Sequence, residues 1–489
     1  MKNNPSNLVR SLLAFLFCLV YLPAAGLAAD SEFLVGWAHD SITPDLPVAL
    51  AGQFHTRISE YVHDPVTATA IAIETRQDGK VVDQAIMVSC DLVAIRGGLQ
   101  ERLRANLQDR LDGFDVQKLF LNATHTHTGP VLQSGIYELP QEGVMQPDDY
   151  MNFLVDRLAE IVTKAWEQRS PSGISWGLGH AVVGLNRRAV YYPGEARMYG
   201  NTSRDDFSHI EGYEDHSVKL LYFWDTDNQL VGIAINIACP SQEVEGESYL
   251  SADFWHDVRV LLKKAYSEDL FIFPMTAASG DQSPHLMFRK KAEEERRRRK
   301  GISRTQEIAE RIVRAVTSET DIARQYIDFT PAFRHLAETV KLPVRRVTDQ
   351  EYARARELVE RYQDPSSTDR QRHRQVLRHS RVMERYEKQD QEPYYPVEVH
   401  AVRLGDTVIL TNPFELFLDF GIQMEARSPA TLTFVVQLTG NSGGYLPTAR
   451  AVQGRGYGAE IESNNVGPEG GKVLVDRSVA LAESLFEEE

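Results

Sequence analysis

The chain has 489 residues, of which 42% are hydrophobic, so it can bury a large core in one large domain or two smaller ones. Its 69 acidic residues outnumber its 53 basic residues and give a net charge of −16, which argues against a nucleic acid as partner. With only three cysteines, the chain is not a disulfide scaffold.

The N-terminus has the pattern of a secretory signal peptide. Lys2 and Arg10 precede an apolar run at residues 12–22, and small residues follow as far as Ala29. The run is shorter than the roughly 20 residues that a membrane-spanning helix needs, which favours cleavage over a membrane anchor. We therefore expect residues 1–28 to be removed near Ala28 and residues 29–489 to form a secreted or periplasmic catalytic domain.

Strand and helix patterns alternate through the first third of the chain. Residues 68–73, 84–90 and 118–123 have the β-branched and aromatic content of buried strands. Amphipathic helices are predicted at 99–111 and 150–169. This succession predicts an α/β fold, with a mixed β-sheet flanked by helices.

Strand patterns return at 217–240 and 270–275, with a predicted helix at 254–266 between them. They resume at residue 397, and a closing helix is predicted at 476–486.

The intervening segment, residues 285–395, is polar and is predicted to be a charged helical insertion beside the active-site mouth. Its charge-dense run at 289–300 favours a solvated helix with internal ion pairs over a patch for polyanions or membranes. Two polar helices are predicted within 348–390. Thr348 and Glu351 form the capping box that begins the first of them.

The most specific local signal is "LNATHTHTGP" at residues 121–130. Side chains alternate along an extended strand, so His125 and His127 are expected to share one face at the carboxyl end of a buried strand. A single histidine is usually structural, but two on one face indicate metal binding or acid–base catalysis.

This segment resembles the zinc-binding signature of the neutral ceramidases, a family that hydrolyses the amide bond of N-acylsphingosine. Further segments resemble blocks of that family, in the family's order, across roughly residues 33–470. These segments are SCDLVAI (89–95), LNRR (185–188), SADFWHDVR (251–259), SGDQSP (279–284), NPFELF (412–417), GGYLPT (443–448) and GYGAE (456–460).

The resemblance implies a zinc ion (Zn²⁺) and the residues around it. By this resemblance His125, Glu415 and Tyr445 are zinc ligands, whereas His127, Arg187 and Tyr457 are catalytic residues that face the substrate. His127 would pass a proton to the leaving amine, and Arg187 or Tyr457 would stabilise the oxyanion. For Asp281 and Ser283 a structural role is preferred, and a direct catalytic role stays open.

The sequence departs from the family pattern at a further ligand. The family's second histidine ligand ends the strand that reads "INIACPSQ" at 235–242, where this chain has Cys239 at or next to that position. Because a thiolate binds zinc well, we expect Cys239 to be the fourth metal ligand. The alternatives are that Cys239 is an inert buried thiol, and that His256, His285 or a water completes the site.

The resulting prediction is an exported zinc-dependent hydrolase that cleaves an N-acyl amide bond in a lipid or small molecule. The chain is also expected to lack the C-terminal immunoglobulin-like domain of characterised neutral ceramidases. This absence argues against long-chain ceramide as the substrate. Two alternatives remain, namely a zinc hydrolase of a non-lipid amide, ester or glycan, and a metal-depleted binding protein with the same fold. Peripheral membrane contact and the oligomeric state stay open.

Overall fold

The computed structural model describes residues 31–364 and 369–487. The predicted signal peptide, residues 1–28, lies outside these residues. Within the described part of the chain, none of the helices combines the length and the apolar character that crossing a membrane requires.

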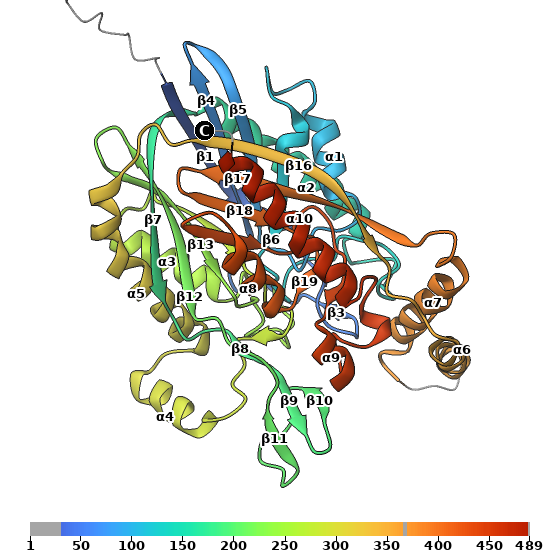
Figure 1. Cartoon of the computed structure of the whole chain (residues 1–489). Coiled ribbons are helices and arrows are strands. Elements are labelled where there is room, and N and C mark those ends of the chain that lie inside the picture. Colours follow the sequence, from blue (N-terminus) through green and yellow to red (C-terminus); the bar gives the residue numbers. More distant parts are fainter. Residues whose placement is uncertain (1–30, 365–368, 488–489) are drawn as a thin grey trace, which may run out of the picture.

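Two β-sheets form the centre of the molecule (Figure 1). The larger has the strand order β14-β13-β12-β7-β1-β4-β5-β6 and is mixed, because β5–β6 and β13–β14 are parallel whereas its other pairs are antiparallel. The smaller has the order β16-β17-β18-β20. The strands of the larger sheet are β1 (Ser31–Ser41), β4 (Thr67–Gln77), β5 (Lys80–Cys90), β6 (Leu119–Ala123), β7 (Ser170–His180), β12 (Ser217–Asp225), β13 (Leu230–Ile237) and β14 (Phe271–Thr276), and those of the smaller are β16 (Phe333–Pro343), β17 (Tyr394–Leu404), β18 (Thr407–Thr411) and β20 (Leu432–Val436).

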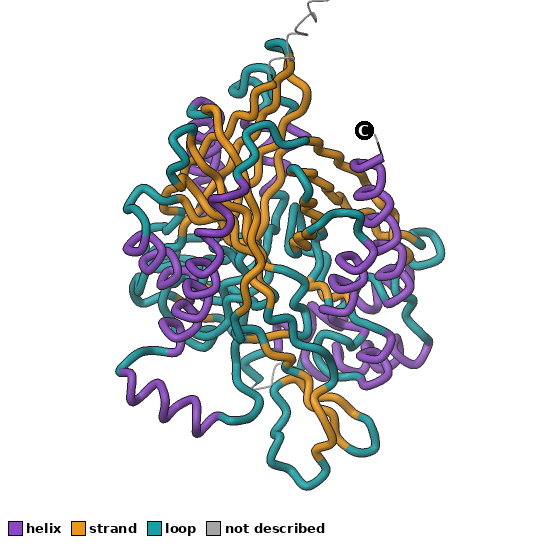
Figure 2. The backbone as a smooth tube through the Cα atoms, turned by 60° about the vertical axis from the view of Figure 1, so that its left-hand side comes forward, coloured by secondary structure: helices purple, strands orange, loops and turns teal. Residues whose placement is uncertain are grey.

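The inner faces of the two sheets share one apolar core, in which Trp37 and Phe223 of the larger sheet cluster with Ile409 and Phe434 of the smaller. Helices cover the outer faces, so helical layers enclose the strands on both sides (Figure 2). This arrangement confirms the predicted α/β fold with a mixed sheet flanked by helices. The larger sheet carries α1 (Leu99–Leu107), α2 (Pro147–Glu167), α3 (Phe254–Ala265) and α5 (Arg304–Ala323), and the smaller carries α8 (Leu418–Arg427) and α10 (Pro468–Glu487).

Short elements complete the fold. Two two-stranded sheets, β8–β15 and β19–β21, join segments that are far apart in the sequence. The remaining elements are β2 (Ala49–Leu50), β3 (Arg57–Ile58), β8 (Leu185–Asn186), β9 (Arg188–Tyr191), β10 (Glu195–Met198), β11 (Phe207–Ile210), β15 (Gln282–Ser283), β19 (Glu415–Leu416), β21 (Tyr445–Leu446), α4 (Lys290–Lys300), α6 (Asp349–Gln363), α7 (Arg372–Lys388), α9 (Ala449–Gly454) and the 3₁₀ helices η1 (Val116–Lys118), η2 (Arg324–Tyr326) and η3 (Ile461–Ser463).

The segment 285–395 is not the single polar helical insertion that its composition predicted. Helix α5 packs into the core under the larger sheet through Ile308 and Ile312. Strand β16 pairs with β17 along its whole length. Its buried residues alternate with exposed ones at each end, at Phe333 and His335 and again at Val340 and Leu342, but the phase changes in the middle.

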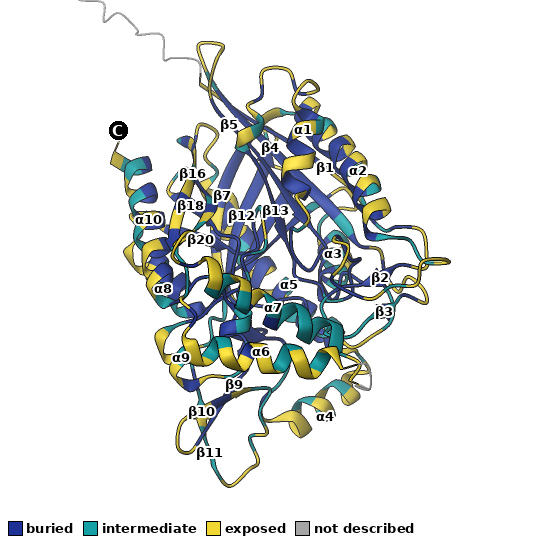
Figure 3. Cartoon of the chain, turned by 90° about the vertical axis from the view of Figure 1, so that its right-hand side faces the viewer, coloured by how far each residue is buried: buried dark blue, intermediate teal, exposed yellow. Residues whose placement is uncertain are grey.

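The other helices of the segment follow the prediction. Helix α4 has no buried residue, and Glu295 pairs with Arg298 and Arg299 within it. Helix α6 begins with the expected capping box of Thr348 and Glu351. Helices α6 and α7 pack on one another, with α6 mostly exposed (Figure 3).

Candidate functional site

Most of the predicted site residues follow the carboxyl ends of strands from both sheets. The loops after β6, β13, β14, β18 and β20 meet there and are joined by backbone hydrogen bonds. His127 N donates to the carbonyl of Ser241 (3.3 Å), and Gly280 N donates to that of Leu416 (2.7 Å). Such edges, where loops from several strands converge, are common sites for ligands in α/β folds.

His125 and His127 lie together, but not because of strand alternation. Strand β6 ends at Ala123, and His125 has a positive φ of 65°, so the expectation of an extended strand through both histidines is wrong. The turn nevertheless brings the two rings to a centroid separation of 4.9 Å, with 3.4 Å between their Nε2 atoms.

The buried imidazole of His125 has a fixed orientation. Its Nδ1 lies 2.5 Å from the carbonyl oxygen of Val93, which can only accept a hydrogen bond, so the proton resides on Nδ1. Its Nε2 then faces the Glu415 carboxylate at 3.3 Å. Metal-ligating histidines commonly have this arrangement, in which one nitrogen donates to a carbonyl and the other is free to bind.

Glu415 and Tyr445 face the same point because β19 and β21 pair in parallel with these residues in register. Arg187 donates from Nη2 to the Tyr445 hydroxyl (3.1 Å), and the Tyr457 ring lies 5.3 Å from that of Tyr445. Burial favours a raised pKa for Glu415, but His125, the Tyr445 hydrogen bond and Arg187 outweigh it and lower the pKa to about 2. Glu415 is therefore an anion at neutral pH.

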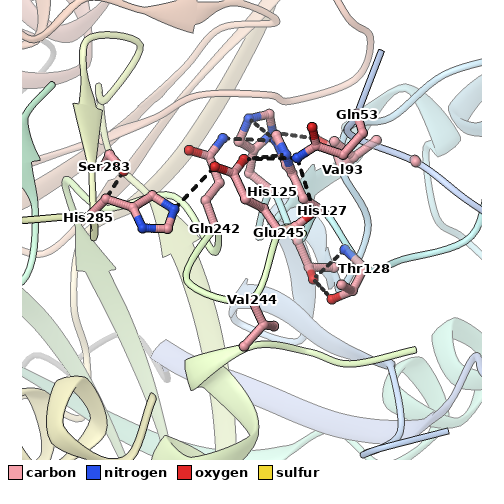
Figure 4. Close-up of polar contacts among 12 residues, drawn as sticks. Gln53, Val93, His125, His127, Thr128, Gln242, Val244, Glu245, Ser283 and His285 are labelled. Atoms are coloured by element: carbon pink, nitrogen blue, oxygen red, sulfur yellow. Dashed lines mark hydrogen bonds and ion pairs between the residues drawn. The ribbon is translucent and has the colours of Figure 1, made fainter. Parts of the chain in front are cut away.

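His127 begins a chain of polar contacts that the motifs did not reveal (Figure 4). Its Nδ1 lies 3.1 Å from the Glu245 carboxylate, whose other oxygen lies 3.1 Å from Nε2 of His285. The amide of Gln242 donates to Nε2 of His127 (2.8 Å) and accepts from Arg187 (3.3 Å). Burial lowers the pKa of His127 to about 4, although Glu245 opposes this shift, so the imidazole is neutral at pH 7.

Two further residues hold His127 in place. The buried guanidinium of Arg57 donates to the carbonyl of His127 (2.5 Å) and to that of Ala51 (2.6 Å). Gly52 lies directly against the imidazole, because a Cβ atom there would be 2.5 Å from Cγ of His127. Neither residue stands in a segment whose local pattern signals a site, since their roles depend on contacts with a distant loop.

Replacing Gly52 with alanine is expected to lower activity about a hundredfold, because the new methyl group would push His127 out of position. Gly79→Ala is the matched control. Gly79 also has a positive φ (74°, against 101° for Gly52), but a Cβ atom there would have no neighbour within 4 Å. The positive φ would strain an alanine at either position, but only Gly52→Ala should lose activity. Turnover assays on folded protein would show this difference. Equal losses in the two variants would contradict this role for Gly52.

Cys239 is not a metal ligand in this structure, contrary to the prediction. Strand β13 ends at the expected edge, but the Cys239 side chain is fully buried in the apolar cluster that contains Phe254 and Val183. Its sulfur contacts the carbonyl of Pro240 at 3.7 Å, and burial raises the pKa of the thiol well above its usual value. Cys239 turns towards helix α3, and the loop that follows it presents Gln242 and Glu245 to His127.

The residues that could hold a metal are therefore His125, Glu415 and Tyr445. Within the described residues, no group of three His, Cys, Asp or Glu side chains is placed to bind a metal ion. One imidazole, one carboxylate and one phenol nevertheless converge, and three protein ligands with one open position suit a catalytic zinc. Neither Cys239 nor His256, which lines a separate cleft beside Asp64, completes this set.

Asp281 and Ser283 have structural contacts. The carboxylate of Asp281 accepts hydrogen bonds from the Asn186 side chain and from Leu418 N, both at 3.0 Å. Ser283 shares a hydrogen bond of 3.0 Å with the Tyr199 hydroxyl. Asp281 thereby ties β8 to the start of α8, and Ser283 ties β15 to the residue that follows β10.

Comparison with known proteins identifies similar folds and one similar sequence. No protein-family model matches the chain. A neutral ceramidase from Pseudomonas aeruginosa is 25% identical over 297 residues, which cover 55% of this chain and 40% of the relative. The match therefore spans less than half of the relative's length.

Solved structures match over more of the chain. The crystal structure of neutral ceramidase from Pseudomonas aeruginosa has a TM-score of 0.67 at 16% identity, covering 93% of this chain and 75% of that one. A ceramidase complexed with C2 has a TM-score of 0.65 at 15% identity, covering 93% and 76%. The chain thus shares the fold of these proteins, and the resemblance to the neutral ceramidase family that its motifs indicated is confirmed.

Proposed function

We propose that this chain, which shares the fold of the neutral ceramidases, is a zinc-dependent hydrolase that cleaves an N-acyl amide bond of the ceramide type. The proposal rests mainly on one observation. His125, Glu415 and Tyr445 converge on one point, and Arg187 and Tyr457 lie beside them. The names of the similar proteins support the ceramide-type substrate. The signal-peptide pattern of residues 1–28 supports export.

The chain's own residues suit amide hydrolysis. Neutral His127 accepts a proton from the attacking water and returns it to the leaving amine, and Glu245 orients its ring. Arg187 and Tyr457 place cationic and phenolic donors where the amide oxygen gains charge. Zinc held by His125, Glu415 and Tyr445 would polarise the carbonyl and lower the pKa of a bound water towards ~7.

The test is hydrolysis of N-acyl lipids and of non-lipid amides by the purified, zinc-reconstituted protein. We expect about one zinc per chain, and turnover of the N-acyl lipids above that of the non-lipid amides. His125→Ala should lose both the metal and the activity, whereas His209→Ala, at an exposed histidine outside the site, should keep both.

Two results would overturn the proposal. Zinc and turnover of the non-lipid amides alone would indicate a different hydrolase. A protein that takes up no zinc and hydrolyses none of the compounds would indicate a binding protein with this fold.

A further inference from the structure

A cleft of about 410 Å³ lies beside the candidate site and is lined by five arginines. Helix α7 supplies four of them and the loop before α1 supplies the fifth. We call this the arginine cleft, and its arginines are Arg96, Arg374, Arg378, Arg381 and Arg385. Positions 374, 378, 381 and 385 follow the i, i+4, i+7 spacing of one helix face, so α7 presents them together.

The arginine cleft is strongly positive in a chain whose net charge is −16. Its lining contains one carboxylate, that of Glu462, which lies 3.4 Å from His379. None of the five arginines forms an ion pair with a carboxylate of the described residues. Five positive charges in one cleft repel one another, so an anion that joined them would be held strongly.

Three of the five arginines are fixed by neutral groups. Arg385 donates to the carbonyl of Ile461 (2.9 Å), Arg378 to the hydroxyl of Ser463 (3.1 Å) and Arg96 to that of Ser442 (3.4 Å). The half-buried Arg374 has an Nε atom that is buried without a hydrogen-bond partner in the described residues. This orientation by uncharged partners leaves the guanidinium charges available to a ligand.

The arginine cleft adjoins the catalytic residues directly. The guanidinium of Arg378 lies 5.7 Å from the centre of the Tyr457 ring, and that ring lies 5.3 Å from the ring of Tyr445. Arg374 and Arg378 also lie 5.9 and 5.1 Å from the ring of Phe54, which packs edge-on against Tyr457. A group bound by Arg378 is therefore separated from the proposed metal ligands by a single aromatic ring.

We propose that the arginine cleft binds an anionic group, such as a phosphate, that belongs to the substrate itself. This inference rests on the proposed function and narrows it to N-acyl amides that carry a negative charge near the scissile bond. The planar guanidinium matches the paired oxygens of such groups, which explains arginine at every cationic position of the cleft.

The experiment compares two amides that differ only in a terminal phosphate, N-dodecanoyl-O-phosphoethanolamine and N-dodecanoylethanolamine. For the wild-type protein we expect kcat/KM to be roughly tenfold to a hundredfold higher for the phosphorylated amide, mainly through KM. The double variant Arg374→Gln/Arg378→Gln should lose this preference. The matched control is Arg356→Gln, at an exposed arginine of α6 outside the cleft, and it should keep the preference.

Calorimetric binding separates the possible outcomes. Binding of the phosphorylated amide, lost in the glutamine double variant and partly kept in Arg374→Lys/Arg378→Lys, together with its faster hydrolysis would support the inference. The same binding without hydrolysis of any amide would show that the cleft holds the phosphate but that the proposed function, and with it the assignment to a substrate, fails. Equal kcat/KM for the two amides would overturn the inference while leaving the function intact. Binding of inorganic phosphate without any preference for the phosphorylated amide would assign the cleft to a free anion and would also overturn it.

Discussion

Replacing His127 with glutamine is expected to lower kcat for amide hydrolysis by about a hundredfold to ten-thousandfold, the usual contribution of a positioned acid–base group. Glutamine keeps a polar side chain at this buried position but cannot carry the proton between water and amine. The zinc content should stay near that of the wild type, because His127 is not among the proposed ligands. Steady-state kinetics together with elemental analysis would show this separation.

The contacts of His127 make the prediction specific. Glu245 lies 3.1 Å from Nδ1 of His127, so Glu245→Gln should lower kcat in the same direction but less, since it changes the orientation of the imidazole and leaves the proton carrier in place. His209→Gln, at an exposed histidine, is the control and should change neither quantity. A loss of zinc in His127→Gln as large as in His125→Ala would show instead that His127 is a ligand.

Replacing Arg188 with methionine is expected to lower the free energy of unfolding by about 3–5 kcal/mol, because it leaves the Glu211 carboxylate buried without its partner. Arg188 is 1% exposed and binds Glu211 through two nitrogens, at 2.6 and 3.0 Å. It also donates to the carbonyls of Tyr457 (3.0 Å) and Arg455 (2.6 Å), so it anchors the loop that carries Tyr457. Chemical denaturation would measure the change.

A double variant tests the reason for this loss. Arg188→Met/Glu211→Leu should recover much of the stability, since it removes both charges and leaves apolar side chains in their place. The exposed pair of Arg204 and Asp206 is the control, and Arg204→Met should change stability little because water screens that pair. A double variant no more stable than Arg188→Met would mean that the carbonyl contacts, rather than the buried charge, dominate.

Motifs that occur in a fixed order along the sequence predict most residues of the candidate site. His125, His127, Arg187, Glu415, Tyr445 and Tyr457 were chosen from segments spread over more than 300 residues, and the structure brings them to one place. Local geometry alone does not place every side chain. Strand alternation did not describe His125, and the position of Cys239 in the sequence did not show that its side chain turns into the core.

The sequence by itself determined the elements with a clear local pattern, namely the continuous apolar runs of β4 and β5 and the amphipathic helices α2 and α3, and with them the α/β class. Those patterns are local, because the exposure of each residue depends on its own strand or helix. Strand β16 has no such signal, because its buried residues Phe333 and His335 are out of phase with Val340 and Leu342 and an unburied stretch lies between the two pairs.

Only the tertiary structure decided which loops meet. The contacts of Glu245 with His127 and His285, and of Arg57 with the His127 carbonyl, join residues far apart in the chain and leave no local signature. The four arginines of α7 could be placed on one helix face from their spacing, but the same spacing suits a solvated surface. They form a cleft because α7 packs beside the loop that carries Tyr457 and Ile461, where Val382 of α7 joins an apolar cluster with Ile461, Ala355 and Val347. The sequence of α7 alone does not name these partners, because they come from other parts of the chain.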